Sequence, residues 1–267
     1  MSRTGSRTSR PHRVTGTALE IAVPVLILLV WGIWSARAGS LYFPPLTDIV
    51  EAFWTTLLLD RFVSDVLPSL GRLACGYVLG VGLGVVAGFL LGLSEPLTRI
   101  SGPVVHFMRA LPAPAILPFA LLVFGLGDGM KISLIAFGCF FPVLLTTIDG
   151  VRGIEPDYLA ATRVYGIGWG DRLRHVMLPA ALPQIVGGMR TSLSLGFILI
   201  VISEMVAATS GIGYFVLQAQ RTYELPNMWA GMILLGLLGY IVNVAFVLVE
   251  RRVLRWHRGA RATAGAQ

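Results

Sequence analysis

The chain has 267 residues, of which 55% are hydrophobic and only 13% are charged, and its mean hydropathy is +0.76. A soluble domain usually carries about 25% charged residues, so this composition excludes an ordinary soluble globular protein and indicates a chain that folds in a bilayer. The net charge of +7 comes largely from arginines at the two ends, where they flank apolar segments. That placement favours the tails of a membrane protein over a nucleic-acid-binding surface.

Six apolar segments are long enough to cross a membrane. A spanning helix needs about 20 apolar residues, because each residue adds about 1.5 Å to a hydrocarbon core of about 30 Å. This rule predicts an all-α polytopic membrane protein with six transmembrane helices, at residues 17–36, 66–93, 103–126, 130–150, 184–208 and 228–249. Residues 17–250 would form one transmembrane domain with a polar loop at 151–183, and residues 1–16 and 251–267 would be basic tails.

The arginines predict the orientation of these helices. An even number of crossings places both termini on the same side, together with the loop at 151–183. That side would hold most of the arginines outside the spans, whereas the other side holds only Arg37, Arg61 and Arg221. Because positive residues accumulate on the cytoplasmic side, the tails and the loop are predicted to be cytoplasmic.

The first predicted span has a second interpretation. Its basic start, its apolar run and the sequence Ala36-Arg37-Ala38 resemble a secretory signal peptide with a cleavage site. The apolar run is long for a signal peptide and five further spans follow it, so a retained helix is favoured.

Glycine occurs at every fourth position in the second predicted span. On a helix these residues form one stripe, which lets a neighbouring helix approach closely and gain dispersion contacts. Packing within the subunit is the favoured interpretation, and a contact between subunits or a moving contact is the alternative. The stripe consists of Gly76, Gly80, Gly84, Gly88 and Gly92.

Prolines interrupt the third predicted span at Pro112, Pro114 and Pro118. Each proline removes a backbone hydrogen bond and bends or breaks a helix. In lipid the freed backbone groups must be satisfied by protein or by cavity water, and broken helices of this kind often line a transport pathway. Pro112 and Pro114 are therefore candidate pathway residues.

Ionisable residues inside the spans also need an explanation, because one at the bilayer centre costs about 2.5–3.5 kcal/mol on insertion scales. Arg72, Arg109, Arg190 and Lys131 lie near predicted span ends, from which their side chains can reach the interface. Glu204 lies well inside the fifth span, so it requires a buried partner or a watery cavity. Two interpretations of Glu204 remain: its carboxylate makes a structural hydrogen bond, or it lies on a translocation pathway.

No arrangement of residues suggests catalysis. The sequence has no G-x-x-x-x-G-K-[ST] nucleotide loop, no His-Glu-x-x-His, no Ser/His/Asp arrangement and no paired-carboxylate site. Cys75 and Cys139 lie in apolar runs and the four histidines are scattered, so neither a disulfide nor a metal site is expected. The expectation is a membrane conduit without a cofactor or metal of its own.

The loop at 151–183 predicts two short helices. The first would run from Pro156 to Tyr165, and the second from a cap at Asp171 to Met177, with glycines turning the chain between them and Pro179 ending the second. The second helix is amphipathic, so it could lie on lipid or fit the groove of a partner protein.

This loop resembles the cytoplasmic loop of the permease subunits of binding-protein-dependent ABC importers. That motif reads Glu-Ala-Ala, three residues, Gly, nine residues, Ile, any residue and Leu-Pro, and its spacing is matched throughout. Ala160 and Thr162 depart from the motif's first Glu and last Ala. The matching positions are Ala160, Ala161, Thr162, Gly166, Val176, Leu178 and Pro179.

Two other segments are similar to the nitrate/sulfonate/taurine/bicarbonate branch of these importers. Residues 109–147 resemble its third and fourth spans, and residues 203–216 resemble its fifth span and the following outer loop. The whole resemblance extends over about residues 65–250.

The resemblance implies a type I ABC importer permease fold in the bacterial inner membrane. Two identical or related permease subunits would pair around a pathway, bind two cytoplasmic ATPase subunits that hold ATP-Mg, and receive the solute from an extracytoplasmic binding protein. Lipid would surround the complex, and no nucleic acid would bind. The implied coupling contact is Ala160, Ala161, Gly166, Arg172, Leu173, Val176, Leu178 and Pro179, and the implied gate is Gly211, Gly213 and Tyr214. Glu204 is the candidate pathway residue for which the structural alternative stays open.

The branch implies a small anion such as a sulfonate, taurine or nitrate as the solute, with an uncharged heterocycle as the alternative. Two other function classes remain open. A secondary transporter driven by an ion gradient would predict internal repeats and several membrane carboxylates, and a membrane enzyme acting on lipid or sugar phosphates would use cytoplasmic arginines. Neither repeats nor a nucleophile is evident in the sequence.

Overall fold

The computed structural model describes residues 22–256 except 24, 28, 36 and 38, and in this part of the chain every regular element is a helix. Four helical runs are long and apolar enough to cross a bilayer: Phe62–Leu93, Asp128–Arg152, Trp169–Ala207 and Leu225–Val253. A fifth crossing is possible if the bent pair Glu95–Ala110 and Ala113–Phe124 counts as one span. The all-α polytopic class is confirmed, whereas six crossings are not reached in the described residues. Of the first predicted span, residues 17–21, 24, 28 and 36 lie outside the described part of the chain, and the described residues of Val25–Ser35 belong to a shorter apolar helix.

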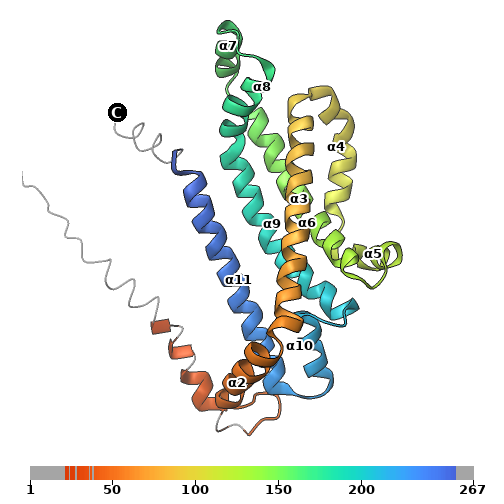
Figure 1. Ribbon diagram of the computed structural model, residues 1–267, viewed down its shortest axis with the longest axis vertical. Helices are drawn as coiled ribbons and strands as arrows, with labels where there is room; N and C mark the ends of the chain where they lie inside the picture. Colours follow the sequence, from red (N-terminus) through yellow and green to blue (C-terminus); the bar gives the residue numbers. More distant parts are fainter. Residues whose placement is uncertain (1–21, 24, 28, 36, 38, 257–267) are drawn as a thin grey trace, which may run out of the picture.

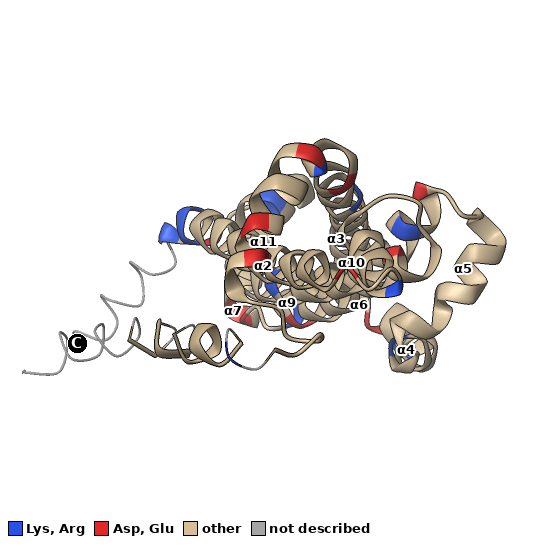
Figure 2. Cartoon of the chain, turned by 90° about the horizontal axis from the view of Figure 1, so that it is seen from below, with Lys and Arg blue, Asp and Glu red and all other residues tan. Residues whose placement is uncertain are grey.

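Three long helices form the centre of the bundle (Figure 1): α3 (Leu67–Leu93), α6 (Asp128–Arg152) and α9 (Leu178–Ala207). On one flank lies α11 (Leu225–Val253), and on the other lie α4 (Glu95–Ala110) and α5 (Leu117–Phe124), as the view along the bundle shows (Figure 2). α4 has no buried residue. The end of the bundle opposite the loop consists of α2 (Leu46–Ala52), the π-helical turns η1 (Phe53–Asp60) and η2 (Phe62–Val66), and α10 (Ile212–Arg221).

The glycine stripe of α3 lies directly against α6. A Cβ added at Gly80 would come within 2.5 Å of the Ala136 carbonyl oxygen, and one at Gly88 within 2.5 Å of the Thr147 Cβ. The structure therefore uses the stripe for helix packing inside the subunit. A Cβ at any of the other three stripe residues would also come within 3.0 Å of α6: Gly76, Gly84 and Gly92.

Gly80→Ala is expected to destabilise the protein by about 1–3 kcal/mol, because the new methyl group overpacks against backbone that cannot rotate away. Gly82 lies on the same helix with nothing within 4 Å of an added Cβ. Gly82→Ala should therefore be neutral or slightly stabilising, since alanine is preferred to glycine inside a helix. Thermal unfolding in detergent checks this pair, and equal midpoints for both variants would contradict the close α3–α6 contact.

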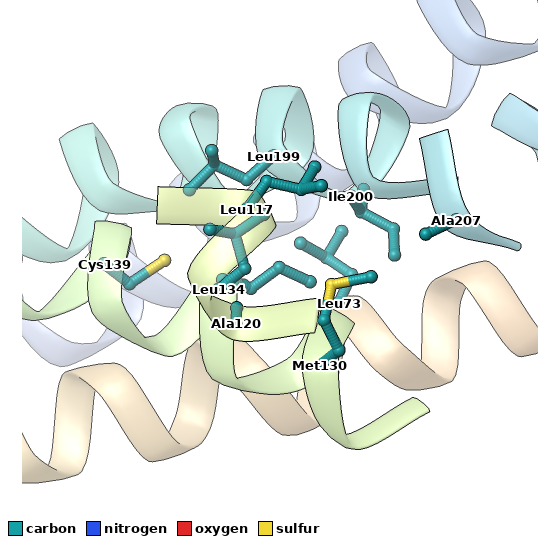
Figure 3. Close-up of a cluster of buried hydrophobic side chains, with 10 residues drawn as sticks. Leu73, Leu117, Ala120, Met130, Leu134, Cys139, Leu199, Ile200 and Ala207 are labelled. Atoms are coloured by element: carbon teal, nitrogen blue, oxygen red, sulfur yellow. The ribbon is translucent and has the colours of Figure 1, made fainter. Parts of the chain in front are cut away.

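A buried apolar cluster holds the central helices and α5 together (Figure 3). Met130 and Cys139 of α6 are fully buried, and the Cys139 thiol donates to the Ser192 carbonyl oxygen of α9 at 3.2 Å. Leu117 and Ala120 attach α5 to this cluster. The α4–α5 arm is thus fixed at one end although most of its surface is exposed.

The prolines break the third predicted span as expected, but its boundaries differ. After α4, residues Ala113–Ile116 form the 3₁₀ turn η3, and the chain bends by 89°. α4 begins at Glu95 rather than at Pro103, because Ser94 caps the helix: the Leu97 N–H donates to the Ser94 hydroxyl at 3.4 Å. The connection between α3 and α4 is therefore the single residue Ser94, not the nine residues that separate the predicted spans 66–93 and 103–126.

The loop between α6 and α9 contains the two short helices that the sequence predicts, α7 (Pro156–Val164) and α8 (Trp169–Arg172). The chain reverses at Gly166, whose φ of +67° favours glycine. The Tyr165 N–H donates to the Ala161 carbonyl oxygen at 3.0 Å, which closes the end of α7.

Two expected details of the second short helix are wrong. Asp171 does not cap it, because the cap position is Gly168 and Asp171 lies in the first turn. Pro179 does not end it, because the π-helical turn η4 (Leu173–Met177) leads directly into α9. Proline is tolerated in the first turn of a helix, where its missing N–H has no partner, so the chain stays helical from Trp169 to Ala207.

Candidate functional site

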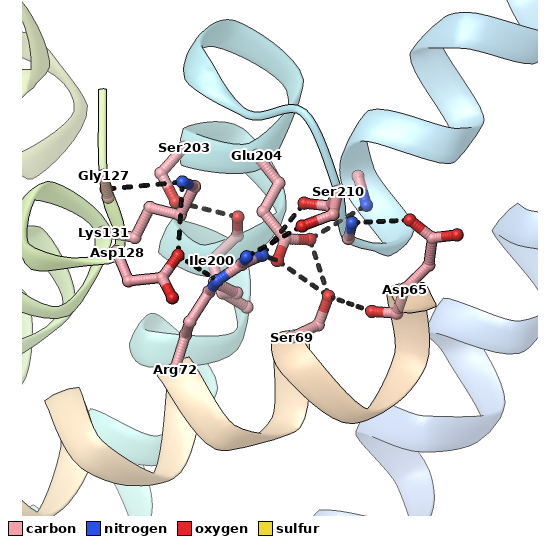
Figure 4. A network of polar contacts seen from close by, with 12 residues as sticks. Asp65, Ser69, Arg72, Gly127, Asp128, Lys131, Ile200, Ser203, Glu204 and Ser210 are labelled. Atoms are coloured by element: carbon pink, nitrogen blue, oxygen red, sulfur yellow. Dashed lines mark hydrogen bonds and ion pairs between the residues drawn. The ribbon is translucent and has the colours of Figure 1, made fainter. Parts of the chain in front are cut away.

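A network of buried polar groups surrounds Glu204, near the end of α9 that is farthest from the loop (Figure 4). Glu204 is only 1% exposed. Its carboxylate accepts hydrogen bonds from the Ser69 hydroxyl at 2.7 Å, the Arg72 Nη1 at 2.9 Å and the Gly213 N–H at 3.1 Å. The charge is therefore compensated by an arginine and two neutral donors, which is the condition for a stable buried carboxylate.

Arg72 connects four parts of the fold. Its Nε lies 2.7 Å from the Asp128 carboxylate at the start of α6, and its Nη1 and Nη2 each donate at 2.9 Å to the carbonyl oxygen and hydroxyl of Ser210. Lys131 lies 3.8 Å from the same Asp128 oxygen. The guanidinium on α3 thus joins α6, the end of α9 and the turn that leads into α10.

Glycines let this turn approach Glu204. Gly211 has a φ of +123°, and a Cβ there would overlap the Glu204 carboxylate. A Cβ at Gly213 would lie 2.6 Å from the Val201 carbonyl oxygen. The Gly211 N–H also donates to Asp65 at 2.8 Å. The structure brings Glu204, Gly211 and Gly213 together inside the protein, with Tyr214 half-buried beside them, and their assignment to a pathway or gate stays a prediction.

A separate cavity of about 430 Å³ lies between α4, η3, α6 and α9. Pro114, a candidate pathway residue, lines it, whereas Pro112 is exposed and does not. Arg109 is the charged residue in its lining. Within the described residues no group of three His, Cys, Asp or Glu side chains could hold a metal ion.

The loop projects beyond the bundle as a compact unit (Figure 1), which we call the wedge and define as residues 156–177. Its outer surface carries large apolar side chains: Tyr165 is 82% exposed and Trp169 is 58% exposed, and Tyr158 and Val164 are also exposed. Sequence reasoning missed these four residues. For three of them, Tyr158, Tyr165 and Trp169, the sequence signal was an aromatic side chain in an otherwise polar loop.

The motif residues divide between the two sides of the wedge. Ala160, Ala161 and Gly166 are exposed, as is Leu178. Leu173 instead packs against a buried cluster that includes Val151, Ile154, Met177, Ala181 and Ile185. Val176 and Pro179 are half-buried, and Arg172 Nη2 donates to the Ile167 carbonyl oxygen at 3.1 Å. The structure gives Leu173 a packing contact that holds the wedge on the bundle, and the coupling contact itself stays a prediction.

Comparison with known protein families identifies the chain. The family described as "binding-protein-dependent transport system inner membrane component" matches residues 80–255, which is more than half of the sequence. The chain belongs to this family. The family predicted from the loop motif is thereby confirmed, and the wedge and the bundle lie in a multi-pass membrane permease.

Named relatives of this permease lie in the branch that the sequence resembles. It is 31% identical over 238 residues to the putative aliphatic sulfonates transport permease protein SsuC of Bacillus subtilis, covering 88% of this chain and 86% of that one. It is 28% identical over 248 residues to the taurine transport system permease protein TauC of Escherichia coli, covering 90% of each.

The fold also matches a solved structure. The MetNI methionine ABC transporter, in inward-facing conformations, has a chain that aligns with a TM-score of 0.63 at 22% identity, covering 71% of this permease and 94% of that chain. This similarity confirms the predicted type I importer permease fold.

Proposed function

We propose that this permease is the membrane subunit of an ATP-driven importer in the bacterial inner membrane, in which two copies pair and each wedge is held by a cytoplasmic ATPase subunit. An extracytoplasmic binding protein would deliver the solute at the opposite end of the bundle. The observation that carries this proposal is the projecting wedge with its exposed aromatic side chains.

The surface of the wedge fits a protein partner. Exposed large apolar residues that lie close together mark interaction sites, and tyrosine and tryptophan are enriched among the residues that contribute most to binding. Tyr165 and Trp169 stand on either side of the Gly166 turn, so they reach outward from the tip of a fixed helical knob. Such a knob can seat in a groove of a partner.

The wedge is mechanically connected to the far end of the bundle. α8, η4 and α9 form one helical run of 39 residues, from Trp169 to Ala207. A displacement of α8 by the ATPase would therefore move α9 along its length. The far part of α9 carries Glu204, which is bonded to α3 and α10, so motion at the wedge would reach the opposite end through a rigid element.

The distribution of arginines supports a cytoplasmic wedge. Arg152, Arg163 and Arg174 are exposed in or beside it, and the same end of α11 carries further arginines. Positive residues concentrate on the cytoplasmic side of membrane proteins. The further arginines are Arg251 and Arg252 in the last turn of α11 and Arg255 just beyond it.

We further propose that the solute is a small organic anion with a sulfonate group. The names of the relatives support this class, since one is called an aliphatic sulfonates permease and another a taurine permease. An uncharged heterocycle is the alternative solute.

Reconstitution into liposomes with the partner ATPase and binding protein tests the proposed function. We expect a complex of two permeases and two ATPases that takes up solute only with ATP, and whose ATPase rate rises with the loaded binding protein. Uptake by the permease alone, driven by an ion gradient, would establish a secondary transporter instead.

A further inference from the structure

The cavity beside Arg109 lies at the middle depth of the helix bundle. The α6 residues that line it run from Phe137 to Leu145, around the midpoint of that helix, which is roughly 18 Å from either end at about 1.5 Å per residue. The α9 residues in its wall, Leu195 to Leu199, lie within about 10 Å of the middle of their helix, on the side toward Glu204. A ligand in this cavity would therefore sit near the centre of the bilayer.

Arg109 has no counter-charge in the described part of the chain. It lies in the last turn of α4, is exposed, and makes neither a hydrogen bond nor an ion pair there. Arg72, by contrast, is fully engaged by Glu204, Asp128 and Ser210. A cation at this depth is costly unless it faces water or an anion, so the Arg109 side of the cavity is an aqueous surface rather than a lipid-facing one.

The exposed face of α9 supports the same conclusion. Gly187, Arg190, Thr191 and Ser194 follow one another at helical spacing on this face and are exposed in the structure. They continue the line of cavity residues toward the wedge. Polar side chains in the middle of a span face a bundle interior or a water-filled cavity, so this stripe extends the aqueous surface along α9.

The remaining walls of the cavity are apolar. Phe137 and Phe141 of α6 face Leu195 and Ile198 of α9 across it. Its volume of about 430 Å³ falls in the range of about 300–1,000 Å³ that small-molecule sites occupy. One cation beside an apolar chamber matches an anion that carries a short aliphatic tail. A lipid headgroup would lie at the interface, not at this depth.

We propose that this cavity is a binding site for the transported organosulfonate within the membrane, where Arg109 pairs with the sulfonate and the Phe137, Phe141 and Ile198 walls surround the tail. The identity of the occupant rests on the proposed function, because we take the ligand of this site to be the imported solute. Arg109 suits this role because its guanidinium presents several N–H donors to the oxygens of one anion.

A cysteine placed in the wall reports on the site directly. The test uses Ile198→Cys in a Cys75→Ala background, in the permease–ATPase complex in nanodiscs, with buried Cys139 kept and its background reaction subtracted. Two thiol reagents of similar size are compared: sulfonatoethyl methanethiosulfonate, which is itself an alkanesulfonate, and the cationic trimethylammonioethyl methanethiosulfonate. We expect the anionic reagent to react about tenfold or more faster than the cationic one, because Arg109 attracts it at short range.

Charge variants assign this preference to Arg109. Arg109→Gln should abolish the anionic preference and Arg109→Lys should retain most of it. Arg99→Gln is the matched control, because Arg99 lies on the same helix, pairs with Glu95 at 2.8 Å and does not line the cavity, and it should leave the preference unchanged. Excess butanesulfonate should slow the anionic reagent at Ile198→Cys but not at a cysteine introduced at exposed Gly168.

The outcomes separate this proposal from the function on which it rests. Equal rates for both reagents, or an anionic preference that survives Arg109→Gln, would overturn the site even in a complex that transports normally. No reaction at Ile198→Cys, repeated at Leu195→Cys, would show that the cavity is not aqueous and would also overturn it. Failure of ATP-dependent uptake in the wild-type complex concerns the proposed function and is read in the separate reconstitution assay.

Discussion

Glu204→Ala is expected to lower the free energy of unfolding of the permease by about 3–5 kcal/mol, the usual cost of removing one partner from a buried ion pair. The substitution removes the acceptor shared by the Ser69 hydroxyl, the Gly213 N–H and the Arg72 Nη1. The Gly213 N–H then has no acceptor, and Arg72 loses its buried counter-charge although its Nη1 keeps the Ser210 carbonyl oxygen. These donors come from α3 and α10, so the turn after α9 should loosen together with the contact between the two helices. Thermal unfolding of the purified permease in detergent measures the loss.

Two comparisons make this prediction specific. Glu95→Ala removes a carboxylate of the same kind from an exposed pair with Arg99, so it should cost no more than about 1 kcal/mol. Arg72→Ala combined with Glu204→Ala should destabilise by clearly less than the sum of the single changes, because the two residues interact directly. Additive effects, or a Glu204→Ala midpoint equal to that of Glu95→Ala, would contradict the network.

Tyr165→Asp is expected to detach the ATPase while leaving the permease folded. The side chain is 82% exposed at the tip of the wedge, so its replacement removes no internal contact of consequence. If Tyr165 is an anchor of the interface, the loss is about 2 kcal/mol or more, which corresponds to roughly 30-fold weaker binding. Co-purification of the ATPase from detergent extracts should fail, and ATP-dependent uptake should fall in proportion.

Tyr223→Asp is the matched control for this experiment. Tyr223 is also an exposed tyrosine, but it lies between α10 and α11 at the opposite end of the bundle. The backbone at position 223 has a positive φ of 59°, which an aspartate tolerates. The fold should therefore be retained and the ATPase should remain bound. If both variants kept the ATPase, or if both lost it, the wedge would not be the specific contact.

Hydropathy and spacing were enough to predict the class and the main helices. The long apolar runs predicted α3, α6 and α11 to within a few residues, because a helix satisfies all the backbone hydrogen bonds of a lipid-buried segment within that segment. The four-residue glycine period predicted a close helix contact, and the loop motif predicted the wedge with its turn at Gly166.

Other features depend on contacts that no local pattern contains. Glu204 and Arg72 are 132 residues apart in the chain, so hydropathy marks each as unusual without pairing them. Asp128 begins α6 at the bundle end and compensates Arg72 there. Leu173 lies in the sequence of the wedge and is predicted to contact the partner. In the structure its side chain packs inward, because α6 and α9 supply an apolar cluster beneath it. Because proline usually breaks a helix, the sequence predicted a helix end at Pro179. In the structure the π-helical turn before this residue keeps α8 and α9 continuous.

The proposed function requires that the wedge lies in the cytoplasm and binds an ATPase subunit there. Gly168→Cys in the Cys75→Ala background tests it most directly, because position 168 is exposed and an added Cβ meets nothing within 4 Å. A membrane-impermeant maleimide should label this cysteine in inverted membrane vesicles but not in intact spheroplasts, and co-expression of the ATPase should slow the labelling. Labelling from outside intact spheroplasts would invert the orientation and contradict the importer described here.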